Sequence, residues 1–147
     1  MPESLPYCSF DPRKLILKLD TILDCQLEAI SPLVNGVMQI VRGMGCAEGK
    51  ETEVEVALRE ALANAVVHGC RGDSSKKVEC SISCDESRGM LIVIRDPGEG
   101  FDPEAIPSPV HGQSLFAAHG RGIYLINQLM DEVHYERGGT EIHMIKR

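Results

Sequence analysis

The amino-acid sequence predicts an α/β fold, because helical and strand patterns alternate along a chain of single-domain length. Residues 51–68 repeat apolar positions at the three- and four-residue intervals of a helix with one buried face. Residues 78–84 and 90–95 are short apolar runs on either side of turn-forming residues, a pattern typical of a β-hairpin. The 147 residues suit one hydrophobic core. We expect an irregular arm at residues 1–12 and a single domain over residues 13–147.

Composition and charge narrow the classes of function. Fifteen basic residues against twenty-two acidic residues give a formal net charge of −7, which would repel a nucleic-acid backbone. No apolar run approaches the roughly 18 residues that suggest a membrane span. The N-terminus lacks the basic start and the continuous apolar run of a secretory signal. We therefore expect a cytoplasmic protein that binds neither nucleic acid nor a membrane directly.

The six cysteines have no CxxC spacing of the kind that builds a zinc site. Because they are scattered through the expected helices and strands, we expect reduced thiols in the core. A metal cluster of His68 and Cys70 with two strand cysteines is the alternative, but four ligands with recognisable spacing are missing. The cysteines are Cys8, Cys25, Cys46, Cys70, Cys80 and Cys84.

An amphipathic pattern follows the first expected strand, which we place at residues 13–19. From Ile22, apolar residues recur at helical spacing until Gly43. Pro32 interrupts this pattern, so either Ser31 is an N-cap with Pro32 in the first turn, or a longer helix is kinked there. The sequence leaves both arrangements open. The apolar set is Leu23, Leu27, Ile30, Val34, Val37 and Val41.

The rest of the chain predicts a helix, a hairpin, a long loop, a helix and a second hairpin. The helix at residues 51–68 has acidic residues in its first turns and Gly69 as its stop. Residues 97–119 are rich in proline and glycine without periodicity, which is typical of a functional lid loop. The next helix is expected at residues 120–130. The last strands are expected at residues 132–136 and 140–145, around a turn at 137–139.

Glu60 and Asn64 are four residues apart on the expected helix and therefore share a face. Magnesium prefers oxygen ligands together with water and phosphate, which an Asn carbonyl and a triphosphate can supply. The nearby glutamate is then free to accept a proton. An isolated pair of this kind is typical of a solvated helix face, but this one is set among alanines and leucine and is followed by His68 and Gly69.

Two glycine-rich segments complete the set of candidate residues. Asp96 follows a buried strand and can accept a hydrogen bond from an exocyclic amine such as that of adenine, while Gly98 and Gly100 let backbone approach a ligand. Alone, this loop reads as an ordinary turn. The second segment contains Gly120, Arg121 and Gly122 and opens a helix, where free N–H groups and the helix dipole favour phosphate.

These three segments, in this order and on these expected elements, resemble the GHKL ATPases, which include gyrase, sensor histidine kinases and mismatch-repair ATPases. The sequence is most similar to the small stand-alone serine kinases that act as bacterial anti-sigma factors, from Arg13 to the C-terminus. This resemblance implies the Bergerat fold, a two-layer α/β sandwich that has a mixed sheet, helices on one face and a lid loop. It also implies ATP and Mg²⁺ as ligands.

The resemblance implies a role for each candidate residue. Glu60 would be the general base, Asn64 would bind Mg²⁺, and Asp96 would bind adenine. The adenine pocket would be shaped by Gly98 and Gly100. Contacts to the phosphates fall on Gly120, Arg121 and Gly122, and Thr140 would add a polar contact to the nucleotide.

The implied function is that of an ATP-dependent anti-sigma factor and serine/threonine protein kinase that phosphorylates an anti-sigma-factor antagonist. The implied partners are the antagonist as phospho-acceptor, a sigma factor, and a second copy of the chain in a homodimer. The alternative is an ATP-binding switch module that binds a sigma factor or another partner without phosphoryl transfer. A complete sensor histidine kinase is not expected, because the residues before Glu60 are already used by the domain.

Overall fold

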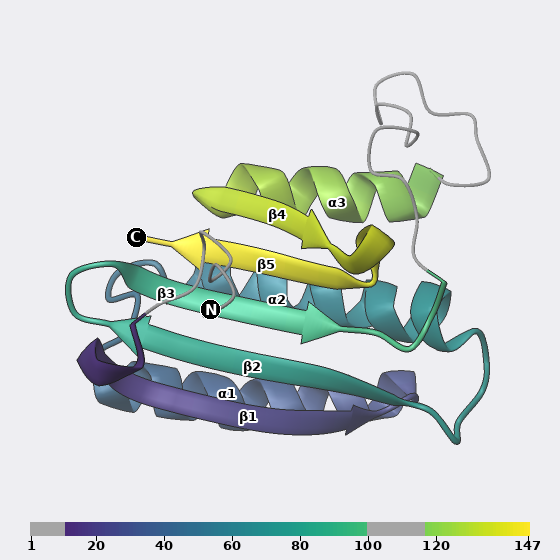
Figure 1. Cartoon of the computed structure of the whole chain (residues 1–147), viewed down its shortest axis with the longest axis horizontal. Coiled ribbons are helices and arrows are strands. Elements are labelled where there is room, and N and C mark those ends of the chain that lie inside the picture. Colours follow the sequence, from purple (N-terminus) through teal and green to yellow (C-terminus); the bar gives the residue numbers. More distant parts are fainter. Residues whose placement is uncertain (1–10, 100–116) are drawn as a thin grey trace, which may run out of the picture.

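One β-sheet with helices on one of its faces makes up the fold (Figure 1). The computed structural model describes residues 11–99 and 117–147. In these residues the strand order is β1-β2-β3-β5-β4. The strands are β1 (Leu15–Asp24), β2 (Lys77–Asp85), β3 (Gly89–Arg95), β4 (Glu132–Glu136) and β5 (Glu141–Lys146). The helices are α1 (Ile30–Met44), α2 (Glu51–Asn64), α3 (Ala117–Leu129) and the π-helix η3 (Ala65–Cys70) that continues α2; short 3-10 turns are η1 (Pro12–Lys14), η2 (Leu27–Ala29) and η6 (Arg137–Gly139).

The expected two-layer α/β sandwich is confirmed, with the core between the sheet and the helices behind it (Figure 1). One detail of the expectation is wrong, since each pair of neighbouring strands in the described residues is antiparallel rather than part of a mixed sheet. The reason lies in the connections. Two helices, α1 and α2, separate β1 from β2, so the chain reverses three times and returns antiparallel to β1. Tight turns join β2 to β3 and β4 to β5.

The first strand is longer than expected and takes residues that were assigned to the first helix. Along β1, exposed side chains alternate with half-buried or buried ones as far as Asp24. Leu23 lies in the core, whereas Ile22 is 63% exposed. Alternation of this kind places residues on opposite faces of a sheet. The helix itself begins at Ile30, with Pro32 in its first turn and Ala29, not Ser31, at the N-cap position. A proline there leaves the helix unkinked, because first-turn N–H groups have no partner within the helix.

The second helix carries the expected buried stripe, whose members are Val54, Leu58, Leu62 and Ala65. Its end differs from the expectation. Gly69 does not stop the helix, because the chain continues as the π-helix η3 to Cys70 and leaves it at Arg71, which is left-handed with φ 49°. None of the helices within residues 11–99 and 117–147 is long and apolar enough to cross a bilayer.

The cysteines correct a further expectation. Cys25 bonds to Cys70, and Cys46 bonds to Cys84, with Cα atoms 5.9 and 6.2 Å apart. Both separations suit a disulfide, and the fold brings the partners together although they are 45 and 38 positions apart in sequence. Of the described cysteines only Cys80 is a free buried thiol, as was expected for all. Because Cys70 and Cys84 are bonded, they do not join His68 and Cys80 in a metal cluster.

Both hairpins are confirmed within a residue or two of the expected bounds. The last helix begins at Ala117, three residues before its expected start, since two alanines extend it toward the N-terminus. The arm at residues 1–12, apart from its last two residues, and most of the expected lid at 97–119 lie outside the described residues, and so does Gly100.

Candidate functional site

Helices α2 and α3 meet where three of the candidate residues lie. Gly122 is buried, and a Cβ atom built on it would lie 3.0 Å from Glu60 Oε2 and 3.2 Å from Asn64 Nδ2. Asn64 Oδ1 would be 3.4 Å away. Glu60 and Asn64 are both half-buried. The structure therefore brings the Glu60 carboxylate, the Asn64 amide and Gly122 together. Only glycine at position 122 allows both polar groups to keep their present positions.

A second cluster, which we call the Asp96 cluster, consists of Asp96, Gly69 and Gly98. It lies further along the helical rod that α2 and η3 form. A Cβ atom on Gly69 would lie 2.5 Å from Asp96 Cβ, and one on Gly98 would lie 2.9 Å from both Asp96 Oδ1 and Gly69 Cα. These separations are too short for real side chains. Gly69 and Gly98 thus enclose Asp96 from two sides with bare backbone. Glu60 and Gly69 are separated by about 14 Å of helical rise, so one elongated ligand can reach both clusters.

Two hydrogen bonds fix Asp96 in this cluster. Its carboxylate Oδ1 accepts from the Gly98 N–H at 2.8 Å, and its own N–H donates to the Thr140 carbonyl at 2.8 Å. Burial raises the pKa of Asp96 above its ordinary value, and the hydrogen bond from Gly98 partly offsets this effect. A half-buried carboxylate held in this way can accept a hydrogen bond from a ligand amine.

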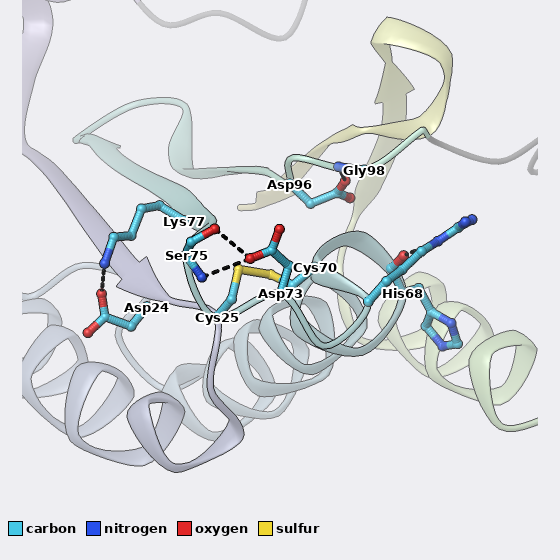
Figure 2. The surroundings of a disulfide bond; sticks show 10 residues. Asp24, Cys25, His68, Cys70, Asp73, Ser75, Lys77, Asp96 and Gly98 are labelled. Atoms are coloured by element: carbon cyan, nitrogen blue, oxygen red, sulfur yellow. Dashed lines mark hydrogen bonds and ion pairs between the residues drawn. A yellow bond between two sulfur atoms is a disulfide. The ribbon is translucent and has the colours of Figure 1, made fainter.

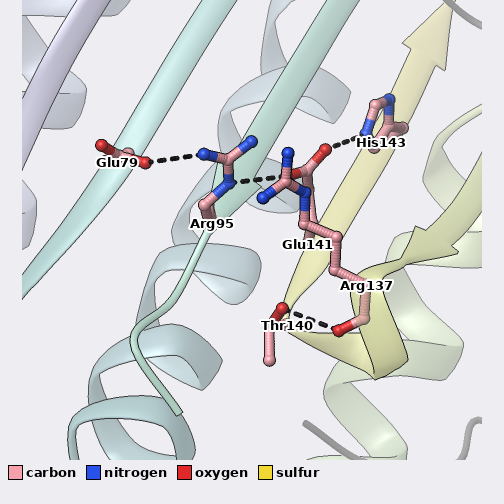
Figure 3. A network of polar contacts seen from close by, with 6 residues as sticks. All are labelled: Glu79, Arg95, Arg137, Thr140, Glu141 and His143. Atoms are coloured by element: carbon pink, nitrogen blue, oxygen red, sulfur yellow. Dashed lines mark hydrogen bonds and ion pairs between the residues drawn. The ribbon is translucent and has the colours of Figure 1, made fainter. Parts of the chain in front are cut away.

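Thr140 takes part through its backbone as well as through its side chain. Its carbonyl holds Asp96, and its Oγ1 donates to the Arg137 carbonyl at 2.9 Å (Figure 3). The hydroxyl therefore closes the turn between β4 and β5. It retains acceptor capacity for a ligand, because a hydroxyl has two lone pairs.

The helix α3 contains Gly120 and Arg121, whose side-chain surroundings lie outside the described residues. The expectation that residues 120–122 form the turn opening this helix is wrong, since the helix already begins at Ala117. Gly120 is then the fourth residue of the helix, at the end of its first turn. Gly122 lies in the second turn, where its role is the close contact with α2.

Sequence reasoning missed two features of this end of the sheet. Gly69 was expected only to stop a helix, whereas it packs against Asp96. The second feature is a polar network on the strands beside Thr140 (Figure 3). Buried Glu141 accepts a hydrogen bond from Arg95 Nε at 2.6 Å, and its Oε1 lies 2.6 Å from His143 Nε2.

This network joins β3 to β5 immediately next to the Asp96 cluster. Burial alone would raise the pKa of Glu141, but hydrogen bonds with His143 and Arg95 outweigh burial and hold the pKa below its ordinary value. Glu141 also pairs with Arg137, at 3.3 Å. Glu141, the first residue of β5, pairs across the strands with Arg95, the last residue of β3, so opposite charges face each other there. The sequence contains both residues but not the register that pairs them.

Comparison with known proteins adds the family. A family model described as a histidine kinase-like ATPase domain matches residues 23–146. The serine-protein kinase RsbW of Bacillus licheniformis is 33% identical over 115 residues, which cover 73% of this chain and 71% of the relative. RsbW of Bacillus subtilis strain 168 is 28% identical over 110 residues, covering 70% and 68%. An anti-sigma F factor of Bacillus thuringiensis is 31% identical over 100 residues, covering 65% and 68%.

The family match spans both clusters of the site and runs from the last two residues of β1 to the end of β5. An ATPase domain implies that the chain binds ATP. The fold, the family match and the relatives agree with one another. This chain belongs to the histidine kinase-like ATPase (GHKL) family, and it is distantly homologous to RsbW serine-protein kinases and anti-sigma F factors.

Proposed function

We propose that this protein is an ATP-dependent anti-sigma factor and a serine/threonine protein kinase whose substrate is an anti-sigma-factor antagonist. The contact of Gly122 with Glu60 and Asn64 carries the proposal, because it gathers a proton acceptor and an amide oxygen at one point. Asp96 follows β3 and packs against Gly69, further along the rod, so it suits the other end of the nucleotide. The relatives named serine-protein kinase and anti-sigma F factor support the choice of this activity.

In the proposed reaction, the substrate hydroxyl oxygen attacks the γ-phosphorus of ATP while the bond from that phosphorus to the β,γ-bridging oxygen breaks, and ADP leaves. The Glu60 carboxylate accepts the proton of the hydroxyl group. Half-burial of Glu60 limits the water that competes for this proton. Gly122 maintains the carboxylate position, because any side chain there would displace it.

The residues around Asn64 fit Mg²⁺, because a carboxylate and an amide oxygen lie together where no side chain of Gly122 fills the space. Asn64 would hold the ion. When bound, Mg²⁺ supplies positive charge that neutralises the phosphates. The first two turns of α3, with Gly120, Arg121 and Gly122, would attract the phosphates through the positive end of the helix dipole and the guanidinium.

At the other end, Asp96 would accept from the exocyclic amine of adenine. Gly98 and Gly100 would keep the pocket free of side chains, and Thr140 would add a polar contact. The orientation of Asp96 by Gly98 and by the Thr140 carbonyl supports this assignment. Preorganised polar groups of this kind lose little freedom when the ligand binds.

We further propose three protein partners: the antagonist as phospho-acceptor, a sigma factor, and a second copy of this chain in a homodimer. A cytoplasmic location is part of this proposal, because sigma factors act there. The net charge of −7 disfavours direct contact with nucleic acid, so control of transcription would pass through proteins.

Transfer of label from γ-labelled ATP to a candidate antagonist tests the proposal. Wild-type protein should label the antagonist, Glu60→Gln should bind ATP but transfer no label, and Asn64→Ala should lose the Mg²⁺-dependent part of binding. Glu48→Gln, which changes the same charge at an exposed loop position, should behave as wild type. Intact ATP binding without any labelling of the antagonist would refute the kinase and leave a switch module that binds partners without transfer.

A further inference from the structure

The disulfide Cys25–Cys70 lies directly beside the Asp96 cluster (Figure 2). Cys70 is the last residue of η3 and follows Gly69, whose backbone touches both Asp96 and Gly98. Cys25 comes one residue after the end of β1. The disulfide therefore joins the end of a strand to the end of the helical rod at the point where that rod meets Asp96.

The disulfide supports a contact between Gly69 and Gly98 that leaves no room for a side chain. A Cβ atom on Gly98 would lie 2.9 Å from Gly69 Cα and 3.0 Å from the Gly69 carbonyl oxygen. A small displacement of Gly69 therefore changes the space around the Asp96 carboxylate. Near the bond, Lys77 at the start of β2 pairs with Asp24, which gives the Cys25 side a second anchor (Figure 2). The Cys70 side ends in the left-handed Arg71, beyond which the chain turns away.

We propose that Cys25–Cys70 is a redox site that sets the affinity of the protein for nucleotide. The disulfide form holds Gly69 against Asp96, and the dithiol form releases the end of η3 and weakens nucleotide binding. The inference rests on the proposed contact of Asp96 with the nucleotide base. A disulfide in a chain that we propose to be cytoplasmic fits a redox sensor, because disulfides in a reducing compartment are usually transient or redox-sensing.

The chemistry is thiol–disulfide exchange with a dithiol reductant. A thiolate of the reductant attacks one sulfur, the Cys25–Cys70 bond breaks, and a mixed disulfide forms. Cys25 is 6% exposed and Cys70 is fully buried, so the attack is assigned to Cys25 Sγ. Cys70 leaves as a thiolate and then takes a proton. The second thiol of the reductant displaces Cys25, which also becomes a thiol. The protein gains two electrons and two protons, and the reductant becomes a disulfide.

The chain contains its own control. Cys46–Cys84 closes a chain segment of similar length, so the two bonds restrict the unfolded chain by similar amounts. Cys84 pairs across the sheet with Met90, at the other end of β3 from Asp96. Asp96 is six positions after Met90 along the strand, or about 20 Å. Breaking either disulfide should therefore change overall stability by a similar amount. Only breaking Cys25–Cys70 should also change the Asp96 cluster.

The experiment measures the dissociation constant for MgATP by titration calorimetry on wild type, Cys25→Ser/Cys70→Ser and Cys46→Ser/Cys84→Ser. Each protein is measured oxidised and after treatment with dithiothreitol, and thiol counting by alkylation verifies its state. Reduction should weaken binding by wild type and by the Cys46/Cys84 variant about 5-fold or more, the usual lower range of coupling between sites. The Cys25/Cys70 variant should bind weakly in both states.

Two results would overturn the inference: an unchanged dissociation constant when Cys25–Cys70 is reduced, or loss of the response in the Cys46/Cys84 variant. If the Cys25/Cys70 variant does not fold, the other two proteins still decide. Amide hydrogen exchange at residues 65–70 gives a second measurement and should quicken on reduction. Asp96→Asn separates this inference from its premise, since unimpaired MgATP binding by that variant would refute the proposed base contact itself.

Discussion

Gly122→Ala tests whether the contact between α2 and α3 is the catalytic part of the site. Within a helix, replacing glycine by alanine gains about 1 kcal/mol of stability. The added Cβ would meet Glu60 Oε2 at 3.0 Å and Asn64 Nδ2 at 3.2 Å. Both are the ends of flexible side chains, so they can turn away at a cost toward the low end of the roughly 1–3 kcal/mol typical of overpacking. We expect the two effects on stability nearly to cancel.

Activity should respond very differently from stability. Moving a catalytic group by about 1 Å can cost on the order of 100-fold in rate, and Glu60 must move by a few tenths of an ångström to accommodate the methyl group. We expect label transfer to the antagonist to fall at least tenfold, or about 1.4 kcal/mol in transition-state stabilisation, while urea unfolding changes by less than about 1 kcal/mol.

Gly36→Ala is the matched control for this substitution. Gly36 is exposed in α1, and a Cβ atom there would have nothing within 4 Å. This variant should gain the full helical contribution of about 1 kcal/mol and retain wild-type activity. The reasoning would be refuted if Gly122→Ala transferred phosphate at the wild-type rate, because Glu60 and Asn64 would then tolerate displacement.

Three further predictions concern the Asp96 end of the site. Gly69→Ala places a Cβ atom 2.5 Å from Asp96 Cβ, so it should lower the free energy of unfolding by about 1–3 kcal/mol and weaken MgATP binding in calorimetry; unchanged affinity would contradict the packing. Because burial raises the pKa of Asp96 and only the carboxylate accepts from an amine, affinity should decline on acidification at a higher pH than an ordinary aspartate predicts. Asp96→Asn should lack this decline in binding titrations across pH. Glu141→Gln should lower the free energy of unfolding by about 1–3 kcal/mol at pH 7. The folded pKa of Glu141 is depressed, so its stabilisation is present above the unfolded pKa and is lost as the pH falls through the folded pKa. Urea melts of the variant should therefore depend less on acid than those of the wild type.

Local patterns predicted most of the elements. Both hairpins and the helix of Glu60 follow from alternation, turn residues and helical spacing, which depend on near neighbours. The start of the first helix was misplaced because Ile22 and Leu23 fit a helical repeat as well as a strand. In the structure both residues belong to the strand, because β1 pairs with β2 at these positions. A single sequence does not contain that partner's register.

Contacts between distant segments could not be predicted in the same way. Helical spacing predicted that Glu60 and Asn64 share a face, but only the packing of α3 on α2 shows Gly122 beside them. The pairing of Cys25 with Cys70 likewise depends on where β1 and η3 end, which spacing alone does not reveal. Gly69 was assigned a local role because glycine is the usual helix terminator, and its tertiary role became visible only beside Asp96.

The π-helical turn of η3 affects which residue faces the Asp96 loop. In a regular α-helix, His68 would lie one turn above Asn64 on the same face, since residues four apart align. A π-turn aligns residues five apart, which puts Gly69 above Asn64, and accordingly Gly69 is buried while His68 is exposed. Deleting a single residue from 65–68 would place Gly69 four residues after Asn64, so α-helical winding would then keep it on the same face. The wide turn thus accommodates one extra residue and still places the bare backbone of Gly69 against Asp96.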